Sequence, residues 1–167
     1  MVRFILGTGI PIIGTLLAFT MGGGHVGALL HMAELVMILS FVLGGMIMAY
    51  GAADISEMFR GGAGLGPEQT PQRLRKNVIV CEGASKFSLF GGFVACFLGV
   101  VITMGSISGD VSLVGERFSA AMSGLVIGAA ITGILFQPLK FKFLNLLNTA
   151  EEAQRQNEKP QHEETVP

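Results

Sequence analysis

The chain has 167 residues, of which 50% are hydrophobic and only 14% are charged, and its formal net charge at pH 7 is −1. A soluble domain of this size needs a more strongly charged surface than this chain can supply, so the composition excludes that class. The charged residues are clustered, and they leave four long uncharged runs: residues 4–33, 35–53, 87–109 and 118–139.

Four stretches are predicted to cross a membrane, because about 20 mostly apolar residues are needed to span the hydrocarbon core. They are residues 4–21, 34–53, 87–106 and 118–139. Arg3 followed by an apolar stretch is also typical of a signal peptide, but no clear cleavage site follows and Pro11 interrupts the run. We therefore predict an all-α integral membrane protein with four spans, forming a membrane domain over residues 1–148.

The placement of lysine and arginine predicts the orientation of these spans. Ten of the eleven basic residues precede the first span, lie in the segment 54–86 or follow the fourth span. The other two connections, 22–33 and 107–117, hold only Arg117. Both termini are expected on the cytoplasmic side, and so is the segment 54–86, which is interpreted as a cytoplasmic loop. The polar tail, residues 149–167, is expected to continue the last helix for a turn or two.

No residue pattern indicates catalysis, a metal site or a cofactor, so we predict that the protein is not an enzyme. Cys81 and Cys96 fall in different compartments of the predicted topology, one of them reducing, so a disulfide is not expected. The three histidines lack metal-ligand spacing. The glycine-rich run at 61–66 lacks the Lys-Ser/Thr pair of a phosphate-binding loop, and we interpret it as a flexible connection.

Small residues recur about four apart on the third and fourth spans, a spacing that lets helix backbones approach closely in lipid. We predict that one set serves helix packing: Gly91, Ala95, Ala120, Gly124, Gly128 and Thr132. A second, mildly polar set is predicted to line a narrow pore: Gly92, Cys96, Gly99, Thr103, Ser106, Ser119 and Ser123. The alternative interpretation is that these faces only pack helix against helix inside one protomer.

Ionisable side chains are absent from the core of every predicted span, although such groups usually mark ion paths in membrane proteins. The nearest acid is Glu34, at the outer end of the second span. It is interpreted either as an interfacial residue in contact with water or as the group that first attracts an ion. If the chain handles protons, a partner must supply the carboxylate within the membrane.

Three stretches together resemble the MotA/TolQ/ExbB proton channel family. They are GTLLAFTMGGGHVGALLHMAELVMIL at 14–39, GGFVACFLGVVITMGS at 91–106 and GERFSAAMSGLVIGAAITGILFQPL at 115–139. The first has a glycine-rich outer connection and an Ala-Glu-Leu-Val start to the second span, as in this family. The third keeps an Ala-Met-x-Gly-x-x-x-Gly core and ends on Pro-Leu. Together they follow the order of the family's spans over about half of the chain.

The resemblance implies a homopentameric ring in the lipid of a bacterial inner membrane, around two copies of a MotB/ExbD/TolR-like single-span protein with a membrane Asp. No nucleic acid partner is implied. Ions then cross between ring and partner, and the ring turns as a rotary motor or stator. Leu125 stands at a pore position where the family has a threonine, and Cys96 replaces a second one. These missing hydroxyls favour protons over sodium as the transported ion.

The resemblance leaves the driven process open, whether bacterial motility by flagellum or gliding, outer-membrane energisation or phage defence. The segment 54–86 is much shorter than the insertion that contacts the flagellar rotor in the family. A self-sufficient small channel or transporter is the main alternative function, and it requires an internal polar site. A structural scaffold is the third, which explains the small residues but not the matched order of spans.

Overall fold

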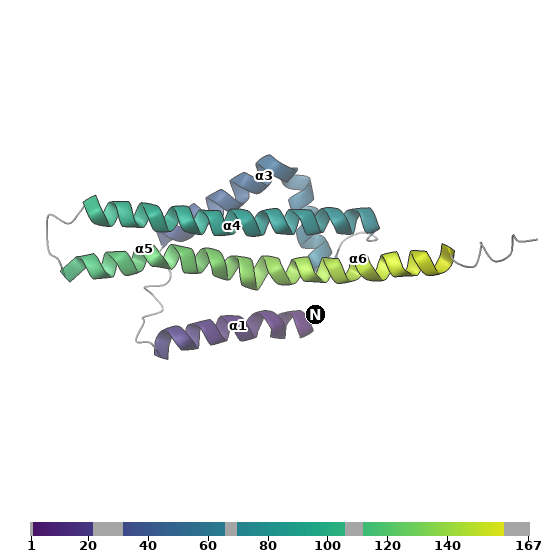
Figure 1. Cartoon of the computed structure of the whole chain (residues 1–167), viewed down its shortest axis with the longest axis horizontal. Coiled ribbons are helices and arrows are strands. Elements are labelled where there is room, and N and C mark those ends of the chain that lie inside the picture. Colours follow the sequence, from purple (N-terminus) through teal and green to yellow (C-terminus); the bar gives the residue numbers. More distant parts are fainter. Residues whose placement is uncertain (1, 22–31, 66–69, 106–111, 159–167) are drawn as a thin grey trace, which may run out of the picture.

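A computed structural model of the chain describes residues 2–21, 32–65, 70–105 and 112–158, and every regular element in these ranges is a helix. The expected all-α class is therefore confirmed for this part of the chain. In chain order the elements are α1 (Val2–Met21), α3 (Met32–Gly62), α4 (Pro71–Gly105), α5 (Ser112–Ile131), the π-helical segment η1 (Thr132–Phe136) and α6 (Gln137–Glu158). Figure 1 shows that α5, η1 and α6 form one nearly straight rod.

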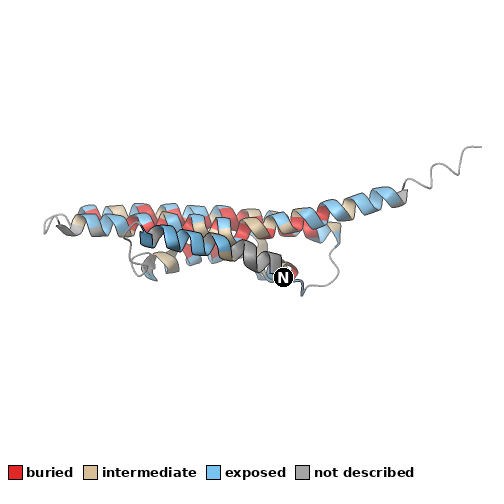
Figure 2. Ribbon diagram, turned by 90° about the horizontal axis from the view of Figure 1, so that it is seen from below, coloured by how far each residue is buried: buried red, intermediate tan, exposed pale blue. Residues whose placement is uncertain are grey.

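Three of the helical stretches are long and apolar enough to cross a membrane: Glu34–Gly62, Pro71–Gly105 and Arg117–Gln156. Their length and composition indicate a membrane protein. The first predicted span is helical as α1, which contacts η1 and is mostly exposed where its side chains are described (Figure 2). Its passage through the membrane, the count of four spans and the sidedness of the termini stay predictions.

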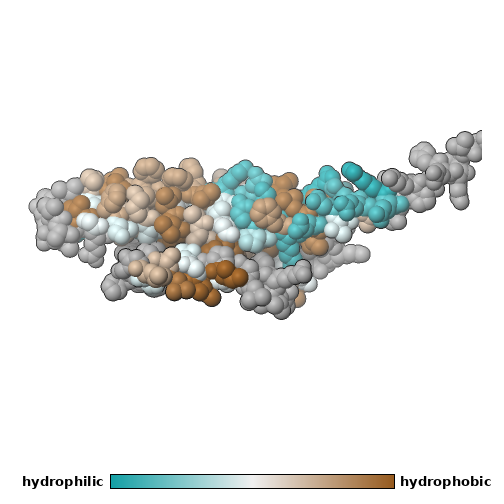
Figure 3. Space-filling model, turned by 60° about the horizontal axis from the view of Figure 1, so that its bottom comes forward, coloured by the Kyte–Doolittle hydropathy of each residue, from teal (hydrophilic) through white to brown (hydrophobic). Residues whose placement is uncertain are grey.

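The long axis of the molecule is an antiparallel hairpin of α4 against the α5–η1–α6 rod (Figures 1 and 2). Its 35 residues make α4 about 50 Å long at 1.5 Å per residue. A hydrocarbon core is only about 30 Å thick, so the hairpin extends well beyond one side of it. Figure 3 shows the two parts, one end of the molecule hydrophobic and the other hydrophilic.

The segment 54–86, predicted as a cytoplasmic loop, is mostly helical in its described residues. α3 continues to Gly62 and α4 begins at Pro71, a residue whose fixed φ suits the first turn of a helix. In the glycine-rich run between them, Gly64 has φ of +75°, a conformation that glycine adopts without steric cost. The last helix also runs further than a turn or two into the tail, to Glu158.

A kink at Gly51, where φ is 80° and ψ is 159°, divides α3 into two arms (Figure 1). The first arm runs alongside α4, and Tyr50 at the end of this arm packs against Gly83 of α4. The second arm turns toward α6, where Gly62 lies against Leu139. There Lys142 Nζ donates a hydrogen bond of 2.6 Å to the backbone oxygen of Gly62. The kink thus lets α3 contact both helical arms of the hairpin, α4 and the α5–η1–α6 rod.

Candidate functional site

The apolar half of the hairpin is closed by small residues that we call the seam: Gly92, Ala95 and Gly99 of α4 with Ala121, Gly124 and Gly128 of α5. A Cβ atom added to Gly92 is 2.9 Å from Gly124 O, and one added to Gly128 is 2.9 Å from Gly92 Cα. Because these neighbours are backbone atoms, a larger side chain cannot be accommodated by changing a rotamer. The two helices therefore touch backbone to backbone, as small residues permit in membranes.

Small residues continue the close packing of the seam toward the end of α4. A Cβ atom added to Gly99 is 2.6 Å from Ala121 Cβ, and one added to Gly124 is 2.9 Å from Ala95 Cβ. Gly92 and Gly99, predicted to line a pore, thus lie against α5 of their own chain. Within the described protomer, these small residues therefore pack one helix against another, as the alternative interpretation states.

Neighbouring residues of α4 face different helices. A Cβ atom added to Gly91 is 3.1 Å from Phe41 Cβ and 3.3 Å from Ile38 Cα, both on α3. Gly91 therefore packs against α3, while Gly92 packs against α5. Since α3 and α5 approach adjacent positions, α4 is the central helix of the three.

The remaining predicted residues are spread around α4 and α5. Cys96 and Thr103 are buried, and Thr103 Oγ1 donates a 2.7 Å hydrogen bond to Gly99 O within its own helix. Ala120 and Leu125 are half-buried, and Ser119 is exposed. Ser106 lies outside the described residues. The structure thus does not collect the predicted pore residues on a single open face of one protomer.

One contact does join two of the predicted functional residues, although they are 89 positions apart. Ser123 Oγ is hydrogen-bonded to Glu34 Oε2, and it also lies 2.7 Å from Ala120 O in its own helix. A hydroxyl has one proton, so Ser123 donates to one of these acceptors at a time or shares the proton between them. Ser123 is only 6% exposed, and Glu34 is half-buried. A carboxylate of α3 is therefore held against a buried hydroxyl of α5.

Glu34 lies deeper along the hairpin than its place at the start of a span suggests. Gly124, next to Ser123, packs against Ala95 and the backbone nitrogen of Cys96. Cys96 is nine residues from the end of α4 at Gly105, which is about 14 Å. α3 begins part-way along the hairpin, so its first turn stands level with the middle of the apolar part of α4. The sequence predicted Glu34 at the outer end of its span and no ionisable group deeper in the membrane, so it did not indicate that Glu34 reaches this level.

Two further hydroxyls link α4 to the rod, and that of Ser88 was not among the residues predicted from the sequence, whereas Thr132 was predicted as a packing residue. Ser88 Oγ donates a 3.0 Å hydrogen bond to Gly128 O, and Thr132 Oγ1 donates a 3.1 Å bond to Ser85 O. All four residues are buried. Ser88 stands four residues before Gly92, so extending the spacing of small residues by one step would have found it. These bonds join the two helices at fixed positions along their lengths.

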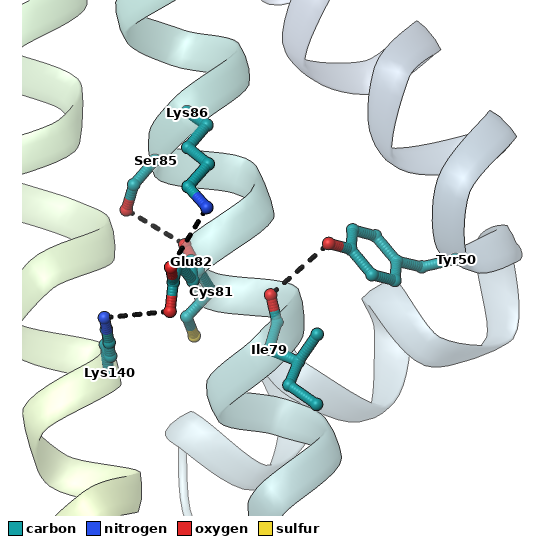
Figure 4. Close-up of polar contacts among 7 residues, drawn as sticks. All are labelled: Tyr50, Ile79, Cys81, Glu82, Ser85, Lys86 and Lys140. Carbon is teal, nitrogen blue, oxygen red and sulfur yellow. Dashed lines mark hydrogen bonds and ion pairs between the residues drawn. The ribbon is translucent and has the colours of Figure 1, made fainter.

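A charged group lies next to these hydrogen bonds, at the boundary between the hydrophobic and hydrophilic parts of the hairpin. Glu82 forms ion pairs of 3.1 Å with both Lys86 and Lys140 (Figure 4). Hydrogen bonds from Lys86 and Lys140 hold the pKa of the Glu82 carboxyl below its usual range. Beside it, burial raises the pKa of the Cys81 thiol to about 12, an effect that nearby Lys140 partly opposes. Cys81 is therefore a protonated, unreactive thiol at neutral pH.

Among the residues that the structure describes, no three His, Cys, Asp or Glu side chains lie close enough together to hold a metal ion. A scan against models of known protein families and a search of curated proteins found no match to this chain. In the described residues, the apolar half of the hairpin offers a half-buried carboxylate, a buried hydroxyl beside it and a closely packed helical wall.

Proposed function

We propose that this protein is the ring subunit of a proton-driven rotary motor in a bacterial inner membrane, acting with a single-span partner that carries a membrane Asp. The observation that carries the proposal is the Glu34–Ser123 contact, level with the middle of the apolar part of α4. A charged group at such depth costs on the order of 3 kcal/mol by insertion scales. Groups that are kept at that cost mark ion pathways in membrane proteins.

The proposed roles follow from the chemistry of the two side chains. The negative charge of Glu34 raises the concentration of cations near the pathway. The Ser123 hydroxyl holds the carboxylate in place and donates to it, which leaves the other carboxylate oxygen to accept from water. The proton then passes to the Asp of the partner, whose access to the two sides changes as the ring turns.

The fold supports a mechanical role as well. The seam joins α4 and α5 through backbone contact, and backbone cannot rearrange as a side chain can. The hairpin continues beyond the apolar half as a helix pair with its own core and ion pairs. A tilt of the apolar half is thereby carried into the hydrophilic half, where a load can be attached. The resemblance of three ordered stretches to the MotA/TolQ/ExbB family supports the same function.

A self-sufficient proton channel is the second candidate, and the Glu34–Ser123 contact gives it specific support. This contact supplies the chain with its own ionisable group at depth, which a channel requires. The two functions differ in what the protein does alone: a channel conducts without a partner, whereas the ring subunit waits for the partner's Asp.

The oligomeric state tests the ring directly. We expect native mass spectrometry of the purified protein, released from two different detergents, to give five copies. Co-expression with a single-span partner of the expected type should add two further chains. A stable monomer or dimer from both detergents would contradict the ring and leave the channel as the better proposal.

A further inference from the structure

Two apolar stretches end at one place on the hairpin. Lys86 is the last charged residue before the uncharged run 87–109, and Lys140 is the first one after the run 118–139. The antiparallel arrangement brings both ammonium groups to one carboxylate, with Lys86 Nζ 3.1 Å from Glu82 Oε1 and Lys140 Nζ 3.1 Å from Glu82 Oε2 (Figure 4). The boundary of the apolar half is thus marked by two neighbouring lysines.

The charges at this boundary do not balance. Glu82 offers one negative charge to two lysines, so the group of three carries a net charge of +1. The other ion pairs of the described residues join one cation to one anion: Arg73 to Glu57, Lys76 to Asp54 and Arg75 to Glu151. The side chains of Lys86, Glu82 and Lys140 are 75%, 45% and 23% exposed, so an external anion reaches the group from the side of Lys86.

An exposed apolar stripe begins directly beside the lysines. Phe90, Phe93 and Phe97 follow Lys86 by four, seven and eleven residues, which places all four on one face of α4. The three phenylalanines are 63%, 49% and 66% exposed. A cationic group at the end of an apolar stripe is complementary to a phospholipid, whose phosphate and acyl chain are joined in the same order.

We propose that Lys86 and Lys140 bind the phosphate of an anionic phospholipid, whose acyl chain lies along the Phe90–Phe97 stripe. The phosphate accepts charge-assisted hydrogen bonds from the two ammonium groups, each of which has three N–H donors and shares one with Glu82. The net charge of +1 selects an anionic headgroup over a zwitterionic one. Long lysine side chains at the ends of apolar helices reach the headgroup region in this way. The site needs the membrane insertion of the hairpin but does not depend on the motor.

The test compares lipids on the purified full-length protein by native mass spectrometry. Dioleoylphosphatidylglycerol should be retained more strongly than dioleoylphosphatidylcholine. Lys86→Gln should weaken the retention of phosphatidylglycerol about fivefold, the effect of one basic residue near an anionic surface, and Lys86→Gln with Lys140→Gln should abolish the preference. Arg155→Gln is the matched control, because it removes the same charge far along α6 and should leave the preference unchanged.

Three results would overturn the site. One is an unchanged preference in the Lys86→Gln protein, whose exposed side chain can be replaced without disturbing the fold, as circular dichroism would verify. Another is an equal loss of preference in the Arg155→Gln control, which would show a general effect of charge. The third is a thermal stabilisation by millimolar inorganic phosphate as large as that by phosphatidylglycerol, which would indicate a site for a free anion instead of a lipid.

Discussion

The apolar and polar halves of the hairpin are held together by different contacts, although α4 and the α5–η1–α6 rod run through both. In the apolar half, Gly92 meets Gly128 and Gly99 meets Ala121, while large apolar side chains such as Phe97 point outward. In the polar half the interior is filled by large side chains: Met58, Leu74, Val80, Phe143 and Leu147. Its surface carries the ion pairs.

The difference reflects the two solvents. In lipid there is no hydrophobic drive between helices, so their attraction depends on close backbone packing and on hydrogen bonds such as Ser88 to Gly128. In water the burial of apolar side chains drives the association, and surface ion pairs add little. One helix pair thus shows the packing rules of a membrane protein at one end and of a soluble protein at the other. Substitutions confined to one half test whether the two halves differ in this way.

The largest expected effect is in the polar half, where Phe143 is fully buried. Phe143→Ala leaves a cavity and should lower the free energy of unfolding by about 3–5 kcal/mol. Phe141→Ala is the matched control, because Phe141 is 59% exposed on the same helix and its loss should have a much smaller effect. Denaturant unfolding in detergent, followed by circular dichroism, measures both. Equal losses would show that this half has no soluble-type core.

In the apolar half the corresponding change is from small to large. Gly128→Leu puts a side chain where even a Cβ atom is 2.7 Å from Ser88 O and 2.9 Å from Gly92 Cα. Since the helices must move apart, the free energy of unfolding should fall by about 3 kcal/mol, the upper part of the range for overpacked sites. Gly44→Leu on α3 is the control, because a Cβ there meets no described atom within 4 Å. If both variants unfold alike, the seam is not a close contact.

The interhelical hydrogen bond of the apolar half should contribute less. Ser88→Ala removes the 3.0 Å bond to Gly128 O and should lower the free energy of unfolding by about 0.6 kcal/mol, the average for such bonds in membranes. Ser56→Ala is the control, because its exposed hydroxyl donates a hydrogen bond to Ala53 O within its own helix. A larger loss in the control would mean that Ser88 does not help to join the helices.

The smallest expected effect is the pH response of the boundary, where hydrogen bonds from Lys86 and Lys140 lower the pKa of Glu82 from its ordinary value of 4.5. A carboxyl group with a lowered pKa stabilises the folded state above pH 4.5 and loses this contribution as the pH falls through its lower, folded-state value. Glu82→Gln should therefore flatten the acid end of a plot of unfolding free energy against pH. A plot with the same slope at acid pH in both proteins would show that Glu82 does not contribute to the pH dependence of stability.

Composition and spacing predicted the physical character of the apolar half. The uncharged runs located the apolar parts of α3, α4 and the rod, and the four-residue spacing identified Gly124 and Gly128 as close-contact positions. Spacing alone does not say which neighbour a small face meets. Gly91 and Gly92 belong to overlapping patterns, yet one packs against α3 and the other against α5. Only the tertiary arrangement distinguishes them.

The extent of the helices and the depth of Glu34 could not be read from the sequence for related reasons. Residues 71–86 carry a mixture of polar and apolar side chains, so the length of α4 beyond its apolar part has no hydropathy signal. The kink at Gly51 is one glycine among many, without a neighbouring proline to mark it. The level of Glu34 depends on where α3 starts relative to α4, which is a property of packing between helices.

Proton flux into liposomes tests most directly whether this chain is the ring of a partner-dependent motor. The purified protein, reconstituted alone and given a pH gradient, is expected to show no proton uptake above that of empty liposomes. Reconstitution with the single-span partner should open a pathway, and Glu34→Gln should reduce its flux while the ring still assembles. Rapid uptake by the protein alone, abolished by Glu34→Gln, would contradict the motor and identify the chain as a channel in its own right.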